Sequence, residues 1–173
     1  MKVVLLNAAT LPVYRSELAS LLIEVIEEGA LVGFEPSLSS QMAEDFFHDL
    51  GPQLTQQHVM LWIARDHNGV MGTVQLKIDN KPTESQSGAG SVSTLLVHPA
   101  VRRSGIARKM MYELEETALG LRCDMLLSDL QSGTGAESFY RSQGYRCRST
   151  SGKHFDFLHY GSRSDAVYYK PLR

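Results

Sequence analysis

The sequence predicts an α/β (α+β layered) fold in one domain that spans residues 1–173. In the second half, apolar runs alternate with segments whose apolar residues recur at helical spacing, which is typical of strand–helix–strand units. One such segment carries an apolar stripe with charged residues between its members. The stripe consists of Ile106, Met110, Leu114 and Ala118. In the first half, Asn68-Gly69 lies between two apolar runs, which is a strong signal of a β-hairpin. These observations indicate a sheet flanked by helices.

The N-terminal part predicts a strand over residues 2–7 and a helix from Leu11 to Glu28. Apolar residues recur along one side of this helix, and the glycine after it is a typical stop. Gly33–Pro36 is expected to be a loop. A second helix should begin at Ser39 or Ser40, either of which can be the N-cap, and run to about Leu50, where Gly51-Pro52 ends it.

The middle of the chain predicts a hairpin and a long loop. Strands are expected at His58–Arg65 and Val70–Ile78, around the turn at Asp66–Gly69. Asp79–Gly90 is polar and contains glycine, serine and proline, so it predicts a mobile loop.

The remaining elements are predicted to alternate between strand and helix. They are a strand at Val92–Val97, a helix to about Gly120, a buried strand at Asp124–Asp129, a helix at Thr134–Gln143, and strands at Tyr145–Ser149 and Ala166–Lys170. A long loop should join the last two strands.

Basic side chains crowd the start of the helix that follows Val97. Arg102, Arg103, Arg108 and Lys109 lie at its N-terminal end, which is already partly positive and carries unpaired N–H groups. Each exposed cation there costs about 0.3–1 kcal/mol, and a bound anion would offset this cost. The neighbouring glycine lets an anion approach the backbone. The pattern predicts a phosphate or pyrophosphate site, and the residues alone fit a solvated basic turn equally well.

Two motifs in this half resemble those of a known family. Arg102-Arg103-Ser104-Gly105-Ile106-Ala107 fits the Arg/Gln-x-x-Gly-x-Gly/Ala pyrophosphate loop of the GNAT (GCN5-related) N-acetyltransferases. A second family block follows at Ala136–Tyr145. The chain looks most like the tabtoxin resistance acetyltransferases, in which a Val-Gly-Phe stretch follows the first helix, as Val32-Gly33-Phe34 does here.

This resemblance implies the GNAT fold, with a mixed, strongly twisted sheet of about six to seven strands and about four helices. Two parallel strands would be splayed open around acetyl-CoA, the expected co-substrate. The implied activity is N-acetylation of a small-molecule amine, such as an antibiotic-like or toxin-like amine. The resemblance implies that the backbone of Leu96 and Val97 holds the pantetheine arm and the acyl carbonyl of acetyl-CoA. The other implied acetyl-CoA contacts are the loop residues Arg102, Arg103, Ser104, Gly105, Ile106 and Ala107.

Two residues are candidates for catalysis. The resemblance implies that Tyr140 protonates the leaving thiolate, and the alternative is an aromatic ring that only packs on the sheet. Asp129 ends a predicted strand, where a carboxylate suits an active-site role or a turn-forming role equally. Many GNAT enzymes carry a glutamate on the strand before the pyrophosphate loop, but Ser91–Val97 contains no carboxylate. The general base would then be Asp129, Glu35, His159 or water, unless the acceptor arrives neutral.

The acceptor pocket is predicted to be lined by aromatic and acidic residues from two loops and by Asp129. The loop residues are Phe34, Glu35, Phe157 and Tyr160. A mostly apolar pocket with one or two carboxylates suits a small cationic amine.

Composition and charge argue against several other classes of protein. A net charge of −2 argues against a nucleic-acid partner, and no apolar stretch is long enough to cross a membrane or to form a signal peptide. Cys123 and Cys147 lack metal-binding spacing, so the sequence predicts no metal, a reduced cytoplasmic setting, and a monomer or homodimer. The rival interpretations are a non-catalytic acyl-CoA-binding sensor and a phosphate-binding structural module.

Overall fold

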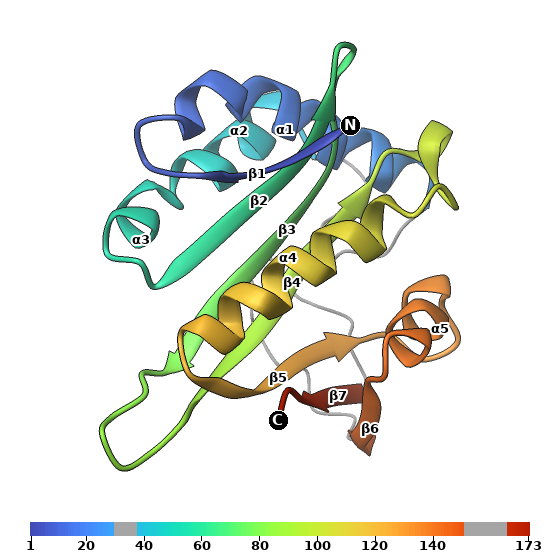
Figure 1. Cartoon of the computed structure of the whole chain (residues 1–173). Helices are drawn as coiled ribbons and strands as arrows, with labels where there is room; N and C mark the ends of the chain where they lie inside the picture. The colour runs from blue at the N-terminus through green and yellow to red at the C-terminus, as the bar shows by residue number, and fades with distance from the viewer. Residues whose placement is uncertain (30–37, 151–165) are drawn as a thin grey trace.

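The computed structural model describes residues 1–29, 38–150 and 166–173 and confirms the α/β prediction. The described strands form one sheet in the order β1-β2-β3-β4-β5-β7-β6. They are β1 (Lys2–Leu6), β2 (Val59–Asp66), β3 (Gly69–Asn80), β4 (Gly88–Val97), β5 (Cys123–Leu130), β6 (Arg146–Thr150) and β7 (Ala166–Pro171). The helices are α1 (Leu11–Glu27), α2 (Ser40–His48), α3 (Gly51–Thr55), α4 (Ile106–Gly120) and α5 (Gly135–Ser142), with a 3₁₀ turn η1 (Pro99–Val101). Helices α1 to α3 cover one face of the sheet, and α4 and α5 cover the other (Figure 1).

Each face of the sheet has its own apolar core. On one face, α1 and α2 pack against Leu61 and Ile63 of β2. On the other face, α4 packs against β3, β4 and β5. The apolar stripe predicted for α4 is confirmed, because Ile106, Met110, Leu114 and Ala118 are all buried. This packing fixes the start of α4, and with it the basic loop, against the end of β4.

The second predicted helix is divided into two. Ser39 is its N-cap, and its hydroxyl accepts a hydrogen bond from the N–H of Met42 at 3.1 Å. However, α2 ends at His48, and Gly51-Pro52 opens the short helix α3 instead of ending the helical segment. Proline is tolerated in a first helical turn, where its missing N–H would have had no intrahelical partner.

The β2–β3 hairpin is confirmed, with two differences from the prediction. Its two turn residues are His67 and Asn68, and Gly69 already pairs with Asp66. The predicted 79–90 loop is too long at both ends, because β3 continues through Asn80 and β4 begins at Gly88. Pairing between these two strands satisfies the backbone groups of residues whose composition favours a loop.

Candidate active site

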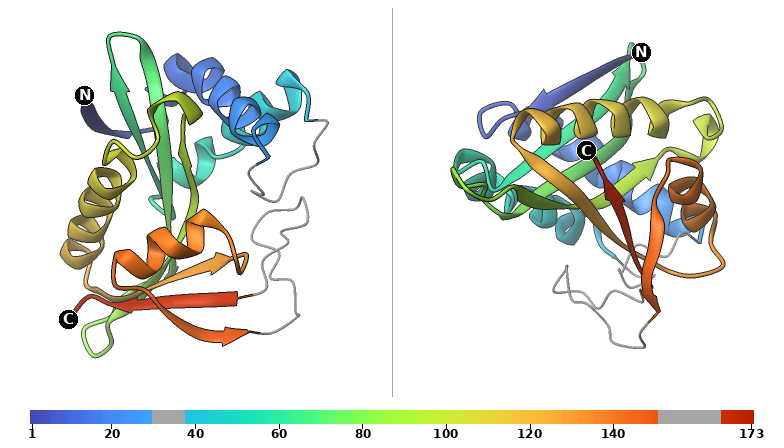
Figure 2. Two further views of the ribbon diagram at one scale, coloured as in Figure 1. Left: turned by 90° about the vertical axis from the view of Figure 1, so that its right-hand side faces the viewer. Right: turned by 60° about the horizontal axis from the view of Figure 1, so that its bottom comes forward.

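The sheet opens between its two parallel strands. β4 and β5 pair only from Gly88 to Ser91, opposite Cys123 to Leu127. Beyond that point β4 stays with β3 and β5 stays with β7, so the two strands diverge (Figure 2). The buried Ser128 hydroxyl donates to the Val92 carbonyl at 3.2 Å, where the strand pairing stops. Divergence of the two strands leaves backbone and side chains of β4 open to a ligand.

A cavity of about 1570 Å³ occupies this opening. Its walls come from the second half of β4, the end of β5, the start of α4 and much of α5, with the last turn of α1 at one side. A space of this size is larger than the 300–1,000 Å³ of ordinary small-molecule pockets. It can therefore take a long ligand together with a second, smaller one.

The basic loop forms one end of the cavity. Arg103 has a φ of 63° and Gly105 a φ of 83°, so the chain turns twice through the left-handed region before α4 begins. Within the described part of the chain, no group accepts a hydrogen bond from the backbone N–H groups of residues 103–108. A Cβ built on Gly105 meets no atom within 4 Å. Free amides at a helix start beside open space and cations form a cradle for phosphate oxygens, so these residues fit a pyrophosphate.

Most of the predicted loop residues line the cavity. Leu96 and Val97 of β4 line it together with Arg102, Arg103, Gly105, Ile106 and Ala107. Arg102 also donates from Nε to the Val97 carbonyl at 3.4 Å, which ties the loop to the end of β4. Ser104 lies outside this lining, and its hydroxyl donates to the Val101 carbonyl.

Tyr140 lies on α5, lines the same cavity, and is only 3% exposed. Its ring packs edge-on against Tyr145, with ring centroids 5.0 Å apart. Burial raises the pKa of Tyr140 to about 12, and a hydrogen bond with the Ser128 hydroxyl opposes this shift only in part. The phenol is therefore neutral across the physiological range and can donate its proton to a ligand.

Asp129 lies on β5 past the point of divergence and also lines the cavity. It is not the last residue of its strand, as the sequence suggested, because β5 continues to Leu130. Its Oδ2 atom is buried and has no hydrogen-bond partner among the described residues. Burial, and then the charge of Asp79, raises the pKa of Asp129 to about 6. A carboxylate with this pKa is a stronger base than an ordinary aspartate and is still ionised at neutral pH.

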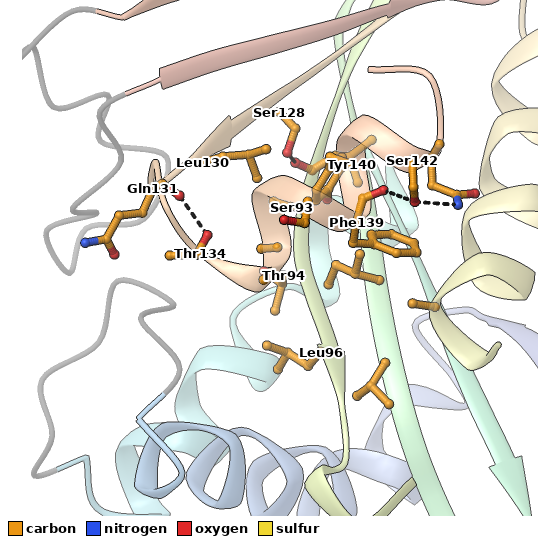
Figure 3. Close-up of a pocket in the computed structure, with 18 of the residues that line it drawn as sticks. Ser93, Thr94, Leu96, Ser128, Leu130, Gln131, Thr134, Phe139, Tyr140 and Ser142 are labelled. Atoms are coloured by element: carbon orange, nitrogen blue, oxygen red, sulfur yellow. Dashed lines mark hydrogen bonds between the residues drawn. The ribbon is translucent and has the colours of Figure 1, made fainter. Parts of the chain in front are cut away.

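Several cavity residues were not expected from the sequence: Ser93, Thr94, Ser128, Gln131 and Thr134 (Figure 3). They are uncharged polar residues without a motif, and no sequence signal singles them out. The predicted acceptor residues Phe34, Glu35, Phe157 and Tyr160, and the candidate base His159, lie outside the described residues. In the described ranges there is no group of three side chains that could hold a metal ion. None of the helices there is long and apolar enough to span a bilayer.

Comparison with known proteins shows the family. A family model described as the Acetyltransferase (GNAT) family matches residues 23–145. The chain belongs to the GNAT acetyltransferase family. It is accordingly a GNAT N-acetyltransferase, and enzymes of this family generally use acetyl-CoA.

Solved structures of other GNAT proteins share the fold. A GNAT acetyltransferase from Staphylococcus aureus Mu50 superposes with a TM-score of 0.73 at 16% identity, over 99% of each chain. Ribosomal-protein-alanine N-acetyltransferase from Brucella melitensis gives a TM-score of 0.70 at 18% identity, also over 99% of each chain. Aminoglycoside 6'-acetyltransferase type Ii gives 0.66 at 15% identity, over 100% of this chain and 98% of that one. These similarities confirm the GNAT fold that the two sequence motifs implied.

Proposed function

We propose that this protein transfers the acetyl group of acetyl-CoA to the amine of a small molecule. The observation that carries the proposal is that one cavity, between β4 and β5, is lined by the amide cradle at one end and by both Tyr140 and Asp129 elsewhere on its wall. The residues assigned to acetyl-CoA are Leu96, Val97 and the 102–107 loop, of which Ser104 shapes the turn. Acetyl-CoA supplies a thioester, which is an activated acyl group.

The two catalytic roles differ in the direction of proton movement. Transfer forms a C–N bond and breaks a C–S bond, so a proton must leave the nitrogen and a proton must reach the sulfur. Asp129 is assigned the first task, because its raised pKa makes it a usable base. Tyr140 is assigned the second, because its buried neutral phenol can donate to the departing thiolate.

The acceptor proposed is a cationic amine. Asp129 Oδ2 and Gln131 Oε1 are buried oxygens without hydrogen-bond partners in the described residues, and both residues line the cavity. Unpaired acceptor oxygens favour a ligand that brings N–H donors. The narrower likeness to tabtoxin resistance enzymes stays a prediction, and it places tabtoxin among the amines to be tried.

An amine panel tests this function. Release of the coenzyme A thiol would be followed with aminoglycosides, tabtoxin, peptides with N-terminal alanine, and simple diamines as acceptors. We expect turnover with at least one cationic small amine. Tight coenzyme A binding without turnover on any amine would contradict the proposal and favour the acyl-CoA sensor.

Replacement of Asp129 by asparagine should lower kcat/KM at pH 7 by about 10². The wild-type rate should rise as pH increases through about 6, where Asp129 ionises. The variant should lack this rise and recover at high pH, where the amine is already neutral. Steady-state kinetics from pH 5 to 10 would measure both profiles; a full rate with an unchanged profile would exclude Asp129 as the base.

Thermal unfolding of the same variant supplies an independent readout. Because the pKa of Asp129 is raised in the folded state, ionisation of Asp129 destabilises the folded protein. This destabilisation is absent at low pH and develops as the pH rises from about 4 through 6. Asp129→Asn should therefore melt above the wild type at pH 7.5 and equal to it near pH 4. Asp124→Asn is the matched control, since Asp124 lies on the same strand outside the cavity lining and pairs with Arg173.

A further inference from the structure

His98 joins the end of β4 to the turn η1, and both nitrogens of its ring have a partner. Its Nδ1 atom accepts a hydrogen bond from the backbone N–H of Ala100 at 3.1 Å. Its Nε2 atom contacts the carboxylate of Glu24 on α1. A backbone N–H can only donate, so Nδ1 carries no proton, and the proton of the neutral ring lies on Nε2 and is donated to Glu24. The ring therefore connects the backbone of η1 to a helix from the start of the chain.

The backbone of His98 is held on both sides as well. Its N–H donates to the Met71 carbonyl of β3 at 2.7 Å, and its carbonyl accepts from the N–H of Val101 at 3.0 Å. None of the three residues of η1 is fully buried, so apolar packing gives this turn limited support. The hydrogen bonds of His98 therefore set how the chain turns from β4 into the basic loop.

The contact with Glu24 reaches the opposite wall of the cavity. Glu24 lies one helical turn before Glu28, so the two side chains lie on the same side of α1. Glu28 lines the cavity together with Val25 and Gly29, at the end of this helix. The basic loop, which lines the same cavity, begins a few residues after His98. The contact between Glu24 and His98 thus holds these two walls against each other.

We propose that His98 is a positioning residue that holds the basic loop in the conformation that binds the pyrophosphate of acetyl-CoA. Its Nδ1 atom sets the turn before the loop, and its Nε2 atom anchors that turn to α1 through Glu24. This role rests on the proposed function, which assigns the loop to acetyl-CoA. A loop that is already ordered loses less entropy on binding, so removal of either contact should weaken binding. The side chains of His98 and Glu24 are 34% and 47% exposed, and polar pairs with such exposure add little to global stability.

Calorimetry with coenzyme A tests the two contacts separately. His98→Leu removes both and should weaken binding about tenfold. His98→Asn keeps an acceptor for the Ala100 N–H, because asparagine readily bonds to the backbone two residues on, but it loses Glu24, so binding should weaken only about threefold. Glu24→Leu should match His98→Asn. The double variant of Glu24→Leu with His98→Asn should bind as well as either single variant, since both changes remove one shared contact.

Steady-state kinetics and melting distinguish this role from a purely structural one. His98→Leu should raise the KM for acetyl-CoA by about the same tenfold factor and change kcat much less. His48→Asn is the matched control, because the Nδ1 atom of His48 bonds to Arg15 Nη1 at 3.0 Å and His48 lies on α2, outside the cavity lining. This control should keep the wild-type affinity for coenzyme A.

Two results would overturn the role of His98. One is wild-type affinity for coenzyme A in His98→Leu, and the other is a lower melting temperature of that variant with no loss of affinity. If His98→Leu fails to fold, Glu24→Leu gives the test with His98 in place, and wild-type affinity would again overturn the role. Failure of the wild type to bind coenzyme A would instead overturn the proposed function, and this role with it.

Discussion

Replacement of Tyr140 by phenylalanine should lower kcat by about 10²–10⁴ while leaving the affinity for acetyl-CoA nearly unchanged. The variant keeps the ring and its edge-on packing against Tyr145, so the cavity wall stays in place. What it loses is the neutral phenol that faces the cavity, a group whose pKa of about 12 keeps its proton available. The departing thiolate would then have to take its proton from water. Steady-state kinetics and calorimetry with acetyl-CoA would measure the two effects separately.

Tyr145→Phe is the matched control for this experiment. Tyr145 is 2% exposed and lies beside Tyr140, but it is not part of the cavity lining, and its hydroxyl donates to Glu115 at 3.3 Å. Its loss should lower the melting temperature slightly and spare kcat. If Tyr140→Phe turns over at the wild-type rate, Tyr140 has no part in proton delivery.

Replacement of Gly105 by valine should weaken binding of coenzyme A by at least ~100-fold, or about 2.8 kcal/mol. Two effects add. The φ of 83° at Gly105 costs a non-glycine residue about 1–2 kcal/mol. The new side chain also enters space that no described atom of the protein fills, which is the space assigned to the pyrophosphate. Calorimetry with coenzyme A would measure the loss.

Gly144→Val separates these two effects. Gly144 has a φ of 90°, and the nearest atom to an added Cβ is the Lys170 Cε at 3.7 Å, so the strain is similar. It lies after α5, outside the cavity lining. This variant should lose stability and keep its affinity for coenzyme A. Equal affinities in the two valine variants would argue against the loop as the pyrophosphate site.

Local signals were enough to predict most of the fold. The stripe on α4 follows from spacing, the end of α5 from a glycine, and the N-cap of α2 from a serine. The differences arose where pairing with a distant strand decides the outcome. Residues 79–80 and 88–90 have a loop-like composition, but Asn80 pairs with Ala89, Gly90 with Ile78 and Gly88 with Cys123, and this pairing extends β3 and β4. Strand ends of this kind depend on contacts that local sequence does not encode.

In the candidate site, too, some features follow from local sequence and others depend on contacts between distant segments. The basic loop, Tyr140 and Asp129 were expected from motifs and position, and they line one cavity. Thr94 was not expected to be part of the site, because its left-handed conformation comes from a register shift between two strands and not from its residue type. The raised pKa of Asp129 could not be predicted from the local sequence either, since it depends on burial and on the charge of Asp79 from another strand. The conformation of Thr94 and the pKa of Asp129 therefore depend on the three-dimensional arrangement of the strands and not on a sequence motif.

A crystal structure with coenzyme A tests the central claim most directly. The account predicts that the pyrophosphate accepts hydrogen bonds from backbone N–H groups of residues 103–108. It also predicts that the thiol lies in the opening between β4 and β5, within hydrogen-bond reach of the Tyr140 hydroxyl. Coenzyme A bound elsewhere, or no coenzyme A bound at saturating concentration, would contradict it.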